Sequence, residues 1–357
     1  MGVGLIGGSL GLALRRTGFT GRIAGVSRDT TVARALELEA IDEGWTYTQL
    51  DKALAGADLV VVCTPIVRIL ELLEEIARHA DPGTLVTDVG STKRRIVERA
   101  EELFGADIHF LGGHPMAGSE KAGVDAADPF LFQNAIYILA EGEPIPDEVR
   151  DRFTRLLRQI GAKVVELRPE LHDQVVAAIS HLPQMMATAL VEMVGRKNEE
   201  QSCFLPLAAG GFRDLTRIAS SPFAPVWEDI CRTNADQIGA MLDEYVAMLQ
   251  DFRDRLEEES LATDFAFANR VRDSIPRDAK GFIHQLNEIL VQAEDRPGIL
   301  AEIATAMREE SININDIEIV KVREGEGGTI RLGFDAEDAA QRALAVLHGL
   351  GYQARRP

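Results

Sequence analysis

Hydrophobic and polar positions alternate along the first half of the chain in blocks typical of a parallel α/β fold. Residues 59–64 form a continuous apolar run, as expected for a strand that is buried on both faces. Helical patterns lie between such runs, for example at 67–79 and 93–104. Further strands are predicted at 22–27, 84–89, 108–112, 135–140 and 163–167. This alternation predicts a doubly wound sheet over residues 1–168.

The pattern changes after residue 168, where strands give way to long helices. Residues 171–195 are mostly helical, with Pro183 as a predicted kink. Residues 234–259 predict one amphipathic helix, because apolar side chains recur at steps of three and four. We therefore predict an all-helical domain over 169–278. Its apolar surface packs either within the chain or against a second copy.

Strands return in the last part of the chain. A break at 275–281, which contains Pro276 and Gly281, predicts a linker. Strands are predicted at 285–292, 312–322, 328–334 and 352–355, and helices at 299–310 and 336–350. This order predicts a small ferredoxin-like α+β module over residues 282–357.

The net charge and the cysteine content of the chain exclude several classes of partner and site. The 357 residues include 38 Lys and Arg against 57 Asp and Glu, a formal net charge of −19. Such a chain repels nucleic acid and anionic membranes, so we expect neither as a partner. The three cysteines form no CxxC pair, and we expect no disulfide framework and no metal site. We see no signal peptide and no apolar run of membrane-spanning length, and therefore expect a cytoplasmic protein.

The chain opens on a G-x-G-x-x-G loop, followed by a helical pattern at 9–16. Such glycines permit a tight turn and a close approach to a pyrophosphate, and the helix directs its first N–H groups at the phosphates. The alternative is a glycine turn without a ligand. The predicted cofactor contacts here are Gly2, Gly4, Leu5, Ile6 and Gly7. A strand should precede this loop, but only Met1 does, so we expect a truncated or misassigned start and otherwise a gap in the sheet.

The residues at the end of the 22–27 strand, which would be the second strand of a complete sheet, distinguish NAD from NADP. An acidic residue there binds the ribose 2′-hydroxyl of NAD, whereas an arginine suits the 2′-phosphate of NADP. The sequence Ser27-Arg28-Asp29 favours tolerance of NADP, while Asp29 keeps NAD open. The remaining predicted cofactor contacts lie at the end of the 59–64 strand and are Cys63, Thr64 and Pro65.

Two polar clusters follow predicted strands of the α/β domain. Residues 88–93 end a strand, where ligands bind in open sheets, so Ser91 either touches a ligand or caps the next helix. His114 follows a double glycine and precedes Pro115, which predicts an irregular loop beside the cofactor. A histidine there can take or give a proton near neutral pH.

A third cluster lies in the helical domain. Arg213 and Arg217 are four residues apart and could share one helical face that binds a carboxylate. The alternative is an internal salt bridge, for example with Asp214 or Glu120. Ser180 either lines the pocket or is an ordinary helix serine.

These segments, in this order, resemble the prephenate dehydrogenase family. Its GxGLIGGS, D-x-x-S-x-K, GxHPxAGxE, SHLP and GGxxDxTRIA motifs correspond here to residues 2–9, 88–93, 112–120, 180–183 and 210–219. The last module resembles an ACT domain, with 295–300 as its turn from strand into helix. Gln184 departs from the pattern, because many members have a second histidine there.

The resemblance implies a Rossmann-like, NAD- or NADP-dependent enzyme that converts prephenate to 4-hydroxyphenylpyruvate on the way to tyrosine. It implies that His114 takes the proton of the ring 4-hydroxyl and that Ser91 hydrogen-bonds the same group. Arg217 would bind a substrate carboxylate, with Glu120 as its gating partner. The other predicted substrate contacts are Ser119, Ser180, Gln184 and Arg213.

Two other functions remain open at this point, namely an arogenate dehydrogenase and a non-catalytic amino-acid sensor with a degenerate cofactor site. We expect a homodimer. Tyrosine or another amino acid is expected to bind the last module, whose alternative role is dimerisation alone. The predicted effector contacts are Asp295, Pro297, Gly298, Ile299, Leu300, Asn313 and Asn315.

Overall fold

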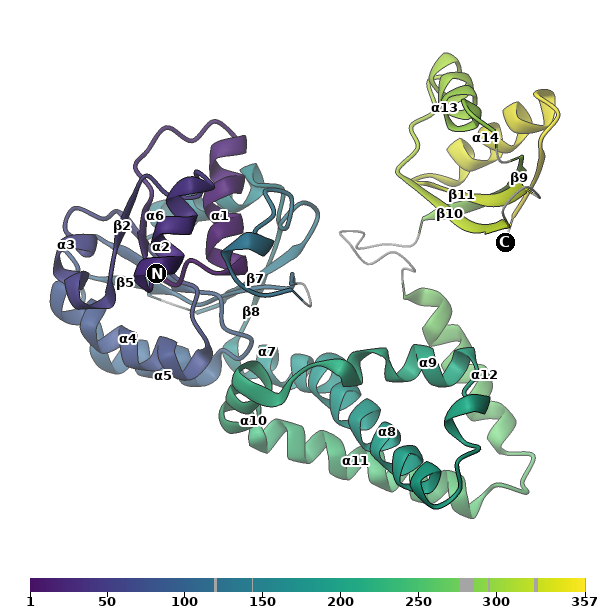
Figure 1. The fold of residues 1–357 in the computed structure, drawn as a ribbon, viewed down its shortest axis with the longest axis horizontal. Helices are drawn as coiled ribbons and strands as arrows, with labels where there is room; N and C mark the ends of the chain where they lie inside the picture. Colours follow the sequence, from purple (N-terminus) through teal and green to yellow (C-terminus); the bar gives the residue numbers. More distant parts are fainter. Residues whose placement is uncertain (119–120, 143, 276–285, 295, 324–326, 357) are drawn as a thin grey trace. The chain divides into compact units, whose positions relative to one another are not determined.

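The computed structural model describes residues 1–118, 121–142, 144–275, 286–294, 296–323 and 327–356. Most of the predicted linker, together with Ser119, Glu120 and Asp295, lies outside this range. The chain divides into two units, Met1–Leu256 and Glu257–Pro357. Each unit is described by itself (Figure 1).

Parallel strands form the first part of the α/β region, as the sequence predicts. Two pair as β1 (Ala24–Val26) and β2 (Glu43–Trp45), and three as β3 (Leu59–Val62), β4 (Leu85–Asp88) and β5 (His109–Leu111). The helices are α1 (Leu5–Arg16), α2 (Asp29–Glu37), α3 (Leu50–Leu54), α4 (Ile66–His79) and α5 (Arg94–Leu103). Helix α1 starts four residues earlier than predicted, which shortens the glycine loop.

The backbone of the first two residues lies between these two parallel sheets. The Met1 amine donates to Val61 O at 2.7 Å, and the Cys63 N–H donates to Met1 O at 2.7 Å. On the other side, the Gly2 N–H donates to Val26 O at 2.7 Å. The predicted gap between β1 and β3 is therefore bridged by these residues.

A third sheet, which is mixed, completes the α/β region. It contains β6 (Gly113–Pro115), β7 (Ile136–Ala140) and β8 (Lys163–Leu167), with β6 antiparallel to β7. Helix α6 (Asp147–Gln159) packs on this part together with α1, while α4 and α5 cover the opposite face (Figure 1). The apolar stripe of α4, which includes Ile69, Leu72 and Ile76, is completely buried. Burial of each such side chain stabilises the fold by about 1.5–3 kcal/mol.

The helical region begins at α7 (Pro169–Val176). A π-helical turn (Ala177–His181) joins α7 to α8 (Leu182–Glu200) in one continuous helical run, and Pro183 lies in the first turn of α8, directly after the change in hydrogen-bond pattern. The chain continues through α9 (Gly210–Thr216), α10 (Glu228–Thr233) and α11 (Ala235–Asp254).

The single long helix predicted over 234–259 is wrong at its end. Helix α11 stops at Asp254, and a further helix, α12 (Leu261–Ser274), follows in the second unit. Glu257, Glu258 and Glu259 occupy the connection. Negative side chains oppose the dipole at a helix C-terminus, so this acidic run disfavours continuation of α11.

The expectation that no segment has the length and composition of a membrane span is also wrong. The helical run Pro169–Glu200 meets that test, although only 28% of its apolar window is buried. It carries His172 and Asp173, which are both buried against the α/β region. These polar contacts identify the run as a helix of the folded domain, and its exposed apolar side chains are available for packing.

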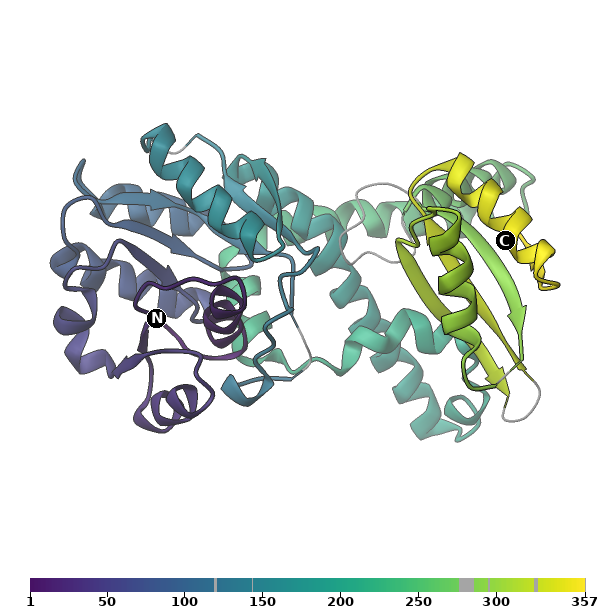
Figure 2. The ribbon, with the colours of Figure 1, turned by 90° about the horizontal axis from the view of Figure 1, so that it is seen from above.

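The second unit contains a four-stranded antiparallel sheet in the order β10-β11-β9-β12. Its strands are β9 (Asn287–Ala293), β10 (Asp316–Arg323), β11 (Gly327–Phe334) and β12 (Gln353–Arg355). Helices α13 (Ile299–Glu309) and α14 (Glu337–Gly349) lie on one face (Figure 2). The core includes Ile289, Val291, Leu332 and Phe334. This confirms the predicted ferredoxin-like module, although β10 begins four residues later than expected.

Candidate active site

The glycine loop has the geometry of a dinucleotide site. Gly2 has a φ of +83°, and a Cβ there would lie 2.6 Å from Cys63 O. A Cβ on Gly7 would collide with Gly2 O, whereas one on Gly4 would meet nothing within 4 Å. The loop is therefore closed on the protein side and open at Gly4, the residue that precedes α1.

Two further observations fit a bound dinucleotide. Within the described ranges no side chain caps the first turn of α1, so the N–H groups of Leu5 and Ile6 are available to a phosphate. The Thr64 hydroxyl, at the end of β3, is buried without a hydrogen-bond partner among the described residues. Burial raises the pKa of the neighbouring Cys63 thiol to about 11, so this side chain is neutral.

The predicted NAD or NADP selector lies at the end of β1. Ser27 is buried next to Tyr47. Tyr47 in turn stacks on the Arg68 guanidinium, 5.2 Å from the ring centre. Arg28 and Asp29 are exposed. Of the predicted selector residues, the structure leaves Arg28 and Asp29 accessible to a ribose or a 2′-phosphate.

His114 does not lie on an irregular loop, as the Gly-Gly-His-Pro sequence predicted. It lies in β6, paired with Ile138 of β7. Pairing with a strand more than twenty residues away in sequence overrides the local loop preference. His114 is therefore buried on a rigid strand, with Nδ1 only 2.8 Å from Nε2 of His172.

His172 and Asp173 complete a chain of hydrogen bonds that the sequence did not reveal. The other ring nitrogen of His172, Nδ1, lies 2.8 Å from Asp173 Oδ1. Because that carboxylate accepts hydrogen bonds, a neutral His172 donates from Nδ1 and accepts at Nε2 from His114 Nδ1. This arrangement leaves Nε2 of His114 as an unprotonated base. His172 and Asp173 are adjacent on a helix, so in sequence they resemble ordinary polar helix residues.

Asp173 also replaces Ser91 in the expected capping role. Helix α5 begins at Arg94, and the N–H groups of Lys93 and Arg94 donate to Asp173 Oδ1 and Oδ2 at 2.7 and 3.1 Å. Ser91 is therefore not the cap of α5. It is half-buried in the turn after β4, where it remains available to a ligand.

Burial lowers the pKa of two histidines in this network. Desolvation lowers the pKa of His114 well below its usual value, and the neighbouring His172 and Lys93 lower it further. Burial likewise lowers the pKa of His181 to about 4. His181 stacks edge-on against Trp227, and Asn234 Nδ2 bridges His181 Nδ1 and the Asp173 carbonyl at 3.3 and 2.9 Å.

The predicted substrate contacts divide into two groups. Ser180 and Gln184 follow His172 along the same helical run, where Gln184 is buried and donates to Thr188 Oγ1 at 3.3 Å. Arg213 lies on α9, but Arg217 begins a 3₁₀ turn (Arg217–Ser220), so the two do not share one continuous α-helical face. Both arginines are exposed, and α9 packs on α8 (Figure 1).

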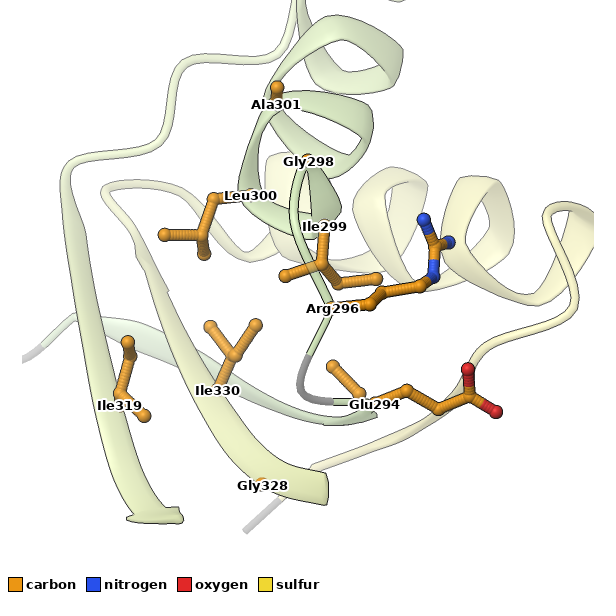
Figure 3. A pocket seen from close by; sticks show the side chains of 10 residues that line it. Glu294, Arg296, Gly298, Ile299, Leu300, Ala301, Ile319, Gly328 and Ile330 are labelled. Carbon is orange, nitrogen blue, oxygen red and sulfur yellow. The ribbon is translucent and has the colours of Figure 1, made fainter. Parts of the chain in front are cut away.

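The C-terminal module contains a cavity of about 430 Å³ between helix α13 and the strands β9, β10 and β11 of the sheet. Three of the predicted effector contacts line this cavity, namely Gly298, Ile299 and Leu300. Ile319 and Ile330 line it as well (Figure 3). Neither Pro297, Asn313 nor Asn315 lines the cavity. The Asn315 side chain instead accepts the Asp335 N–H at 3.1 Å.

Comparison with known proteins places each part of the chain. Residues 10–166 match the nucleotide-binding domain of prephenate dehydrogenase, 168–270 its dimerization domain and 287–346 the ACT domain. The prephenate dehydrogenase of Bacillus subtilis is 37% identical over 350 residues, which cover 96% of this chain and 93% of that protein.

Two solved structures are similar to 76% of the chain. Aquifex aeolicus prephenate dehydrogenase in complex with hydroxyphenyl propionate and NAD+ has a TM-score of 0.69 at 30% identity, over 94% of its chain. Synechocystis arogenate dehydrogenase has a TM-score of 0.67 at 33% identity, over 97% of its chain.

The glycine loop predicts a separation between stability and binding. Gly7→Ala should destabilise the fold by about 1–3 kcal/mol, because its Cβ overlaps Gly2 O. Gly4→Ala should leave the unfolding midpoint unchanged but weaken dinucleotide binding at least tenfold, because its Cβ occupies the open side of the loop. Thermal unfolding and fluorescence titration with NADH measure the two effects. Unaltered NADH affinity in Gly4→Ala would show that the dinucleotide does not approach this loop.

Proposed function

The chain belongs to the prephenate dehydrogenase family, and from this premise we propose that it oxidatively decarboxylates prephenate to 4-hydroxyphenylpyruvate. The observation that carries the proposal is the buried His114–His172–Asp173 chain beside a dinucleotide-type loop. It supplies a neutral base with a defined free nitrogen. A sensor with a degenerate site would have no need for such an arrangement, and we set that alternative aside.

The residues fit NAD, with Arg28 as the feature that keeps NADP open. Gly2, Gly4 and the first turn of α1 would hold the pyrophosphate, and Asp29 or Arg28 would contact the ribose. When bound, the nicotinamide ring supplies the hydride acceptor.

His114 carries the proton in the proposed mechanism. Its Nε2 accepts the proton of the substrate 4-hydroxyl, with Ser91 as a hydrogen-bonding partner, while the hydrogen on the same carbon leaves as hydride. The carbinol becomes a ketone. Loss of CO₂ then breaks the ring carbon–carboxyl bond, and its electron pair aromatises the ring and passes to the ketone oxygen. His114 returns the proton to that oxygen, which gives the phenol.

This cycle explains how the base can be buried. The proton is returned to the oxygen from which it came, so the reaction releases no net proton. His114 therefore needs no path to solvent, and His172 has only to hold the ring in one tautomer. We also propose a cytoplasmic location, which is consistent with three free cysteines at positions 63, 203 and 231.

We further propose a homodimer in which each chain supplies Arg213 and Arg217 to the site of its partner. The arginines lie among exposed apolar side chains, including Leu215 at 67% and Leu207 at 78% exposure. Such a surface is characteristic of an interface, and the matching family model is a dimerization domain. Covering it with a second copy would place the arginines against the partner, where they could bind a dianionic substrate.

The cavity of the C-terminal module supports regulation by an amino acid, and we propose tyrosine. Its walls are apolar, while Arg296 and Glu294 stand at the rim (Figure 3). These two charges suit the carboxylate and ammonium groups of a zwitterion, and the apolar wall suits a ring.

Arogenate is the second candidate substrate, because one of the similar structures is an arogenate dehydrogenase. Arogenate differs from prephenate in carrying an amino group in place of a keto oxygen. Gln184 is uncharged and stands where many family members have a histidine, so it offers no charge to select between the two.

A steady-state assay tests the proposed reaction. Prephenate and arogenate are each crossed with NAD and NADP, and reduced nicotinamide is followed by absorbance. We expect turnover with prephenate, and a loss of roughly 10²–10⁴-fold in His114→Asn at nearly unchanged NADH affinity. Turnover with arogenate alone would replace the substrate, and normal turnover in His114→Asn would exclude it as the base.

Mixed dimers test the shared site. A heterodimer of His114→Asn and Arg217→Ala chains, isolated through two different tags, should recover about half of the wild-type turnover, because one of its two sites is intact. A heterodimer of His114→Asn and Ser91→Ala should recover nothing, because both residues come from the same chain. Equal activities of the two heterodimers would contradict the exchange of arginines.

Two matched leucine variants test the effector cavity. Leu300 lines the cavity, whereas Leu350 is an exposed leucine of the same module outside it. Leu300→Asp should raise the tyrosine concentration for half-inhibition at least tenfold, and Leu350→Asp should leave it unchanged. Deletion of residues 282–357 should abolish the inhibition. If inhibition persists after deletion, tyrosine acts at the catalytic site.

A further inference from the structure

Asp88 and Lys93 form an ion pair whose side chains are both completely buried. Asp88 is the last residue of β4, and Lys93 directly precedes α5. Burial of two charges costs desolvation energy that their attraction seldom exceeds by much, so such a pair is weak support for stability alone. The other contacts of the pair indicate what it contributes.

The Asp88 carboxylate holds the residues that precede both proposed catalytic side chains. Its Oδ2 accepts the Gly90 N–H at 2.7 Å, and Gly90 precedes Ser91. Its Oδ1 accepts the Gly113 N–H at 3.0 Å, and Gly113 precedes His114. One side chain therefore connects the turn after β4 to strand β6.

Both attachment points leave no room for a side chain. A Cβ on Gly90 would lie 2.9 Å from Asp88 Oδ2, and a Cβ on Gly113 would lie 2.7 Å from Asp88 O. The approach of the two backbones to the carboxylate is therefore fixed by packing as well as by hydrogen bonds.

Lys93 links the Asp88 carboxylate, with the two backbone segments that it holds, to the histidines. Its ammonium pairs with Asp88, while its backbone N–H donates to Asp173 Oδ1, the atom that also accepts from His172. The ammonium charge also acts on His114, the proposed base, because Lys93 is one of the groups that lower the pKa of His114.

We propose that Asp88 and Lys93 are a positioning pair, in which Asp88 sets the separation of Ser91 from His114 and Lys93 balances its charge and fixes it to the His172–Asp173 side. The proposal rests on the proposed function, since it concerns the same reacting hydroxyl. Neither residue touches the substrate.

The informative variant removes both charges together, because either single change leaves a buried charge unpaired. In Asp88→Asn/Lys93→Met, an NH2 group replaces one of the two carboxylate oxygens and cannot accept an N–H, so one attachment is lost. We expect a folded dimer with wild-type NADH affinity, a kcat at least tenfold lower and little change in KM. Asp88→Glu, which keeps the charge but moves the carboxylate by one methylene, should lower kcat in the same way.

A second readout needs no substrate. Long-range ¹H–¹⁵N spectra of the ligand-free protein report the protonation and tautomer of His114. Removal of both charges should change the titration of His114 in the double variant, because Lys93 is one of the charges that act on it. Asp88→Glu keeps both charges and should not change it. As a matched control, Arg99→Met/Glu102→Gln removes an exposed ion pair of α5, at 2.8 Å, and should change neither kcat nor the titration.

The outcomes separate the two proposals. Inactivity of the wild-type protein toward prephenate and arogenate would refute the proposed function, while the His114 spectra would still judge the pair. Wild-type kcat and titration in a folded double variant would overturn the positioning role. Loss of the fold in both Asp88 variants would also overturn it, because the pair would then be purely structural.

Discussion

The buried carboxylate of Asp173 is the interaction on which the arrangement of the site depends. It receives the first N–H groups of α5 and the ring N–H of His172, and the carbonyl of the same residue receives Asn234. A buried carboxylate is tolerated only where donors surround it. The α/β region, the helical region and the base are therefore held by one charge, and none of the three can shift without leaving that charge uncompensated.

Much of the architecture could be predicted from sequence, because periodicity is a local property. The parallel strands, the helices between them and the ferredoxin-like module follow from patterns of a few residues each. The environment of His114 could not be predicted, because its strand forms only by pairing with Ile138. His172 and Asp173 were missed for the same physical reason. Their importance comes from contacts with segments 58 and 80 residues away, which helix periodicity does not encode.

The helical region shows a different limit of sequence reasoning. Its apolar residues predict amphipathic helices, but not whether the apolar faces meet within one chain or between two. The structure leaves side chains such as Leu207 and Leu215 exposed within a single chain. In the proposed homodimer, their position near Arg213 and Arg217 would connect the packing of the subunits to the charge of the substrate, a relation that no single motif contains.

The adjacency of His172 and Asp173 has a consequence for the order in which the protein folds. Their contact spans one residue and can form as soon as α7 does, whereas the contact of His114 with His172 requires closure of a long loop. The hydrogen bond between His172 and Asp173 is thus local structure. The hydrogen bond between His114 and His172 forms only when the sheet and the helices dock. A chain that has completed its sheet but not this docking step contains His114 with no control over its tautomer. We therefore expect catalytic competence to arise late in folding.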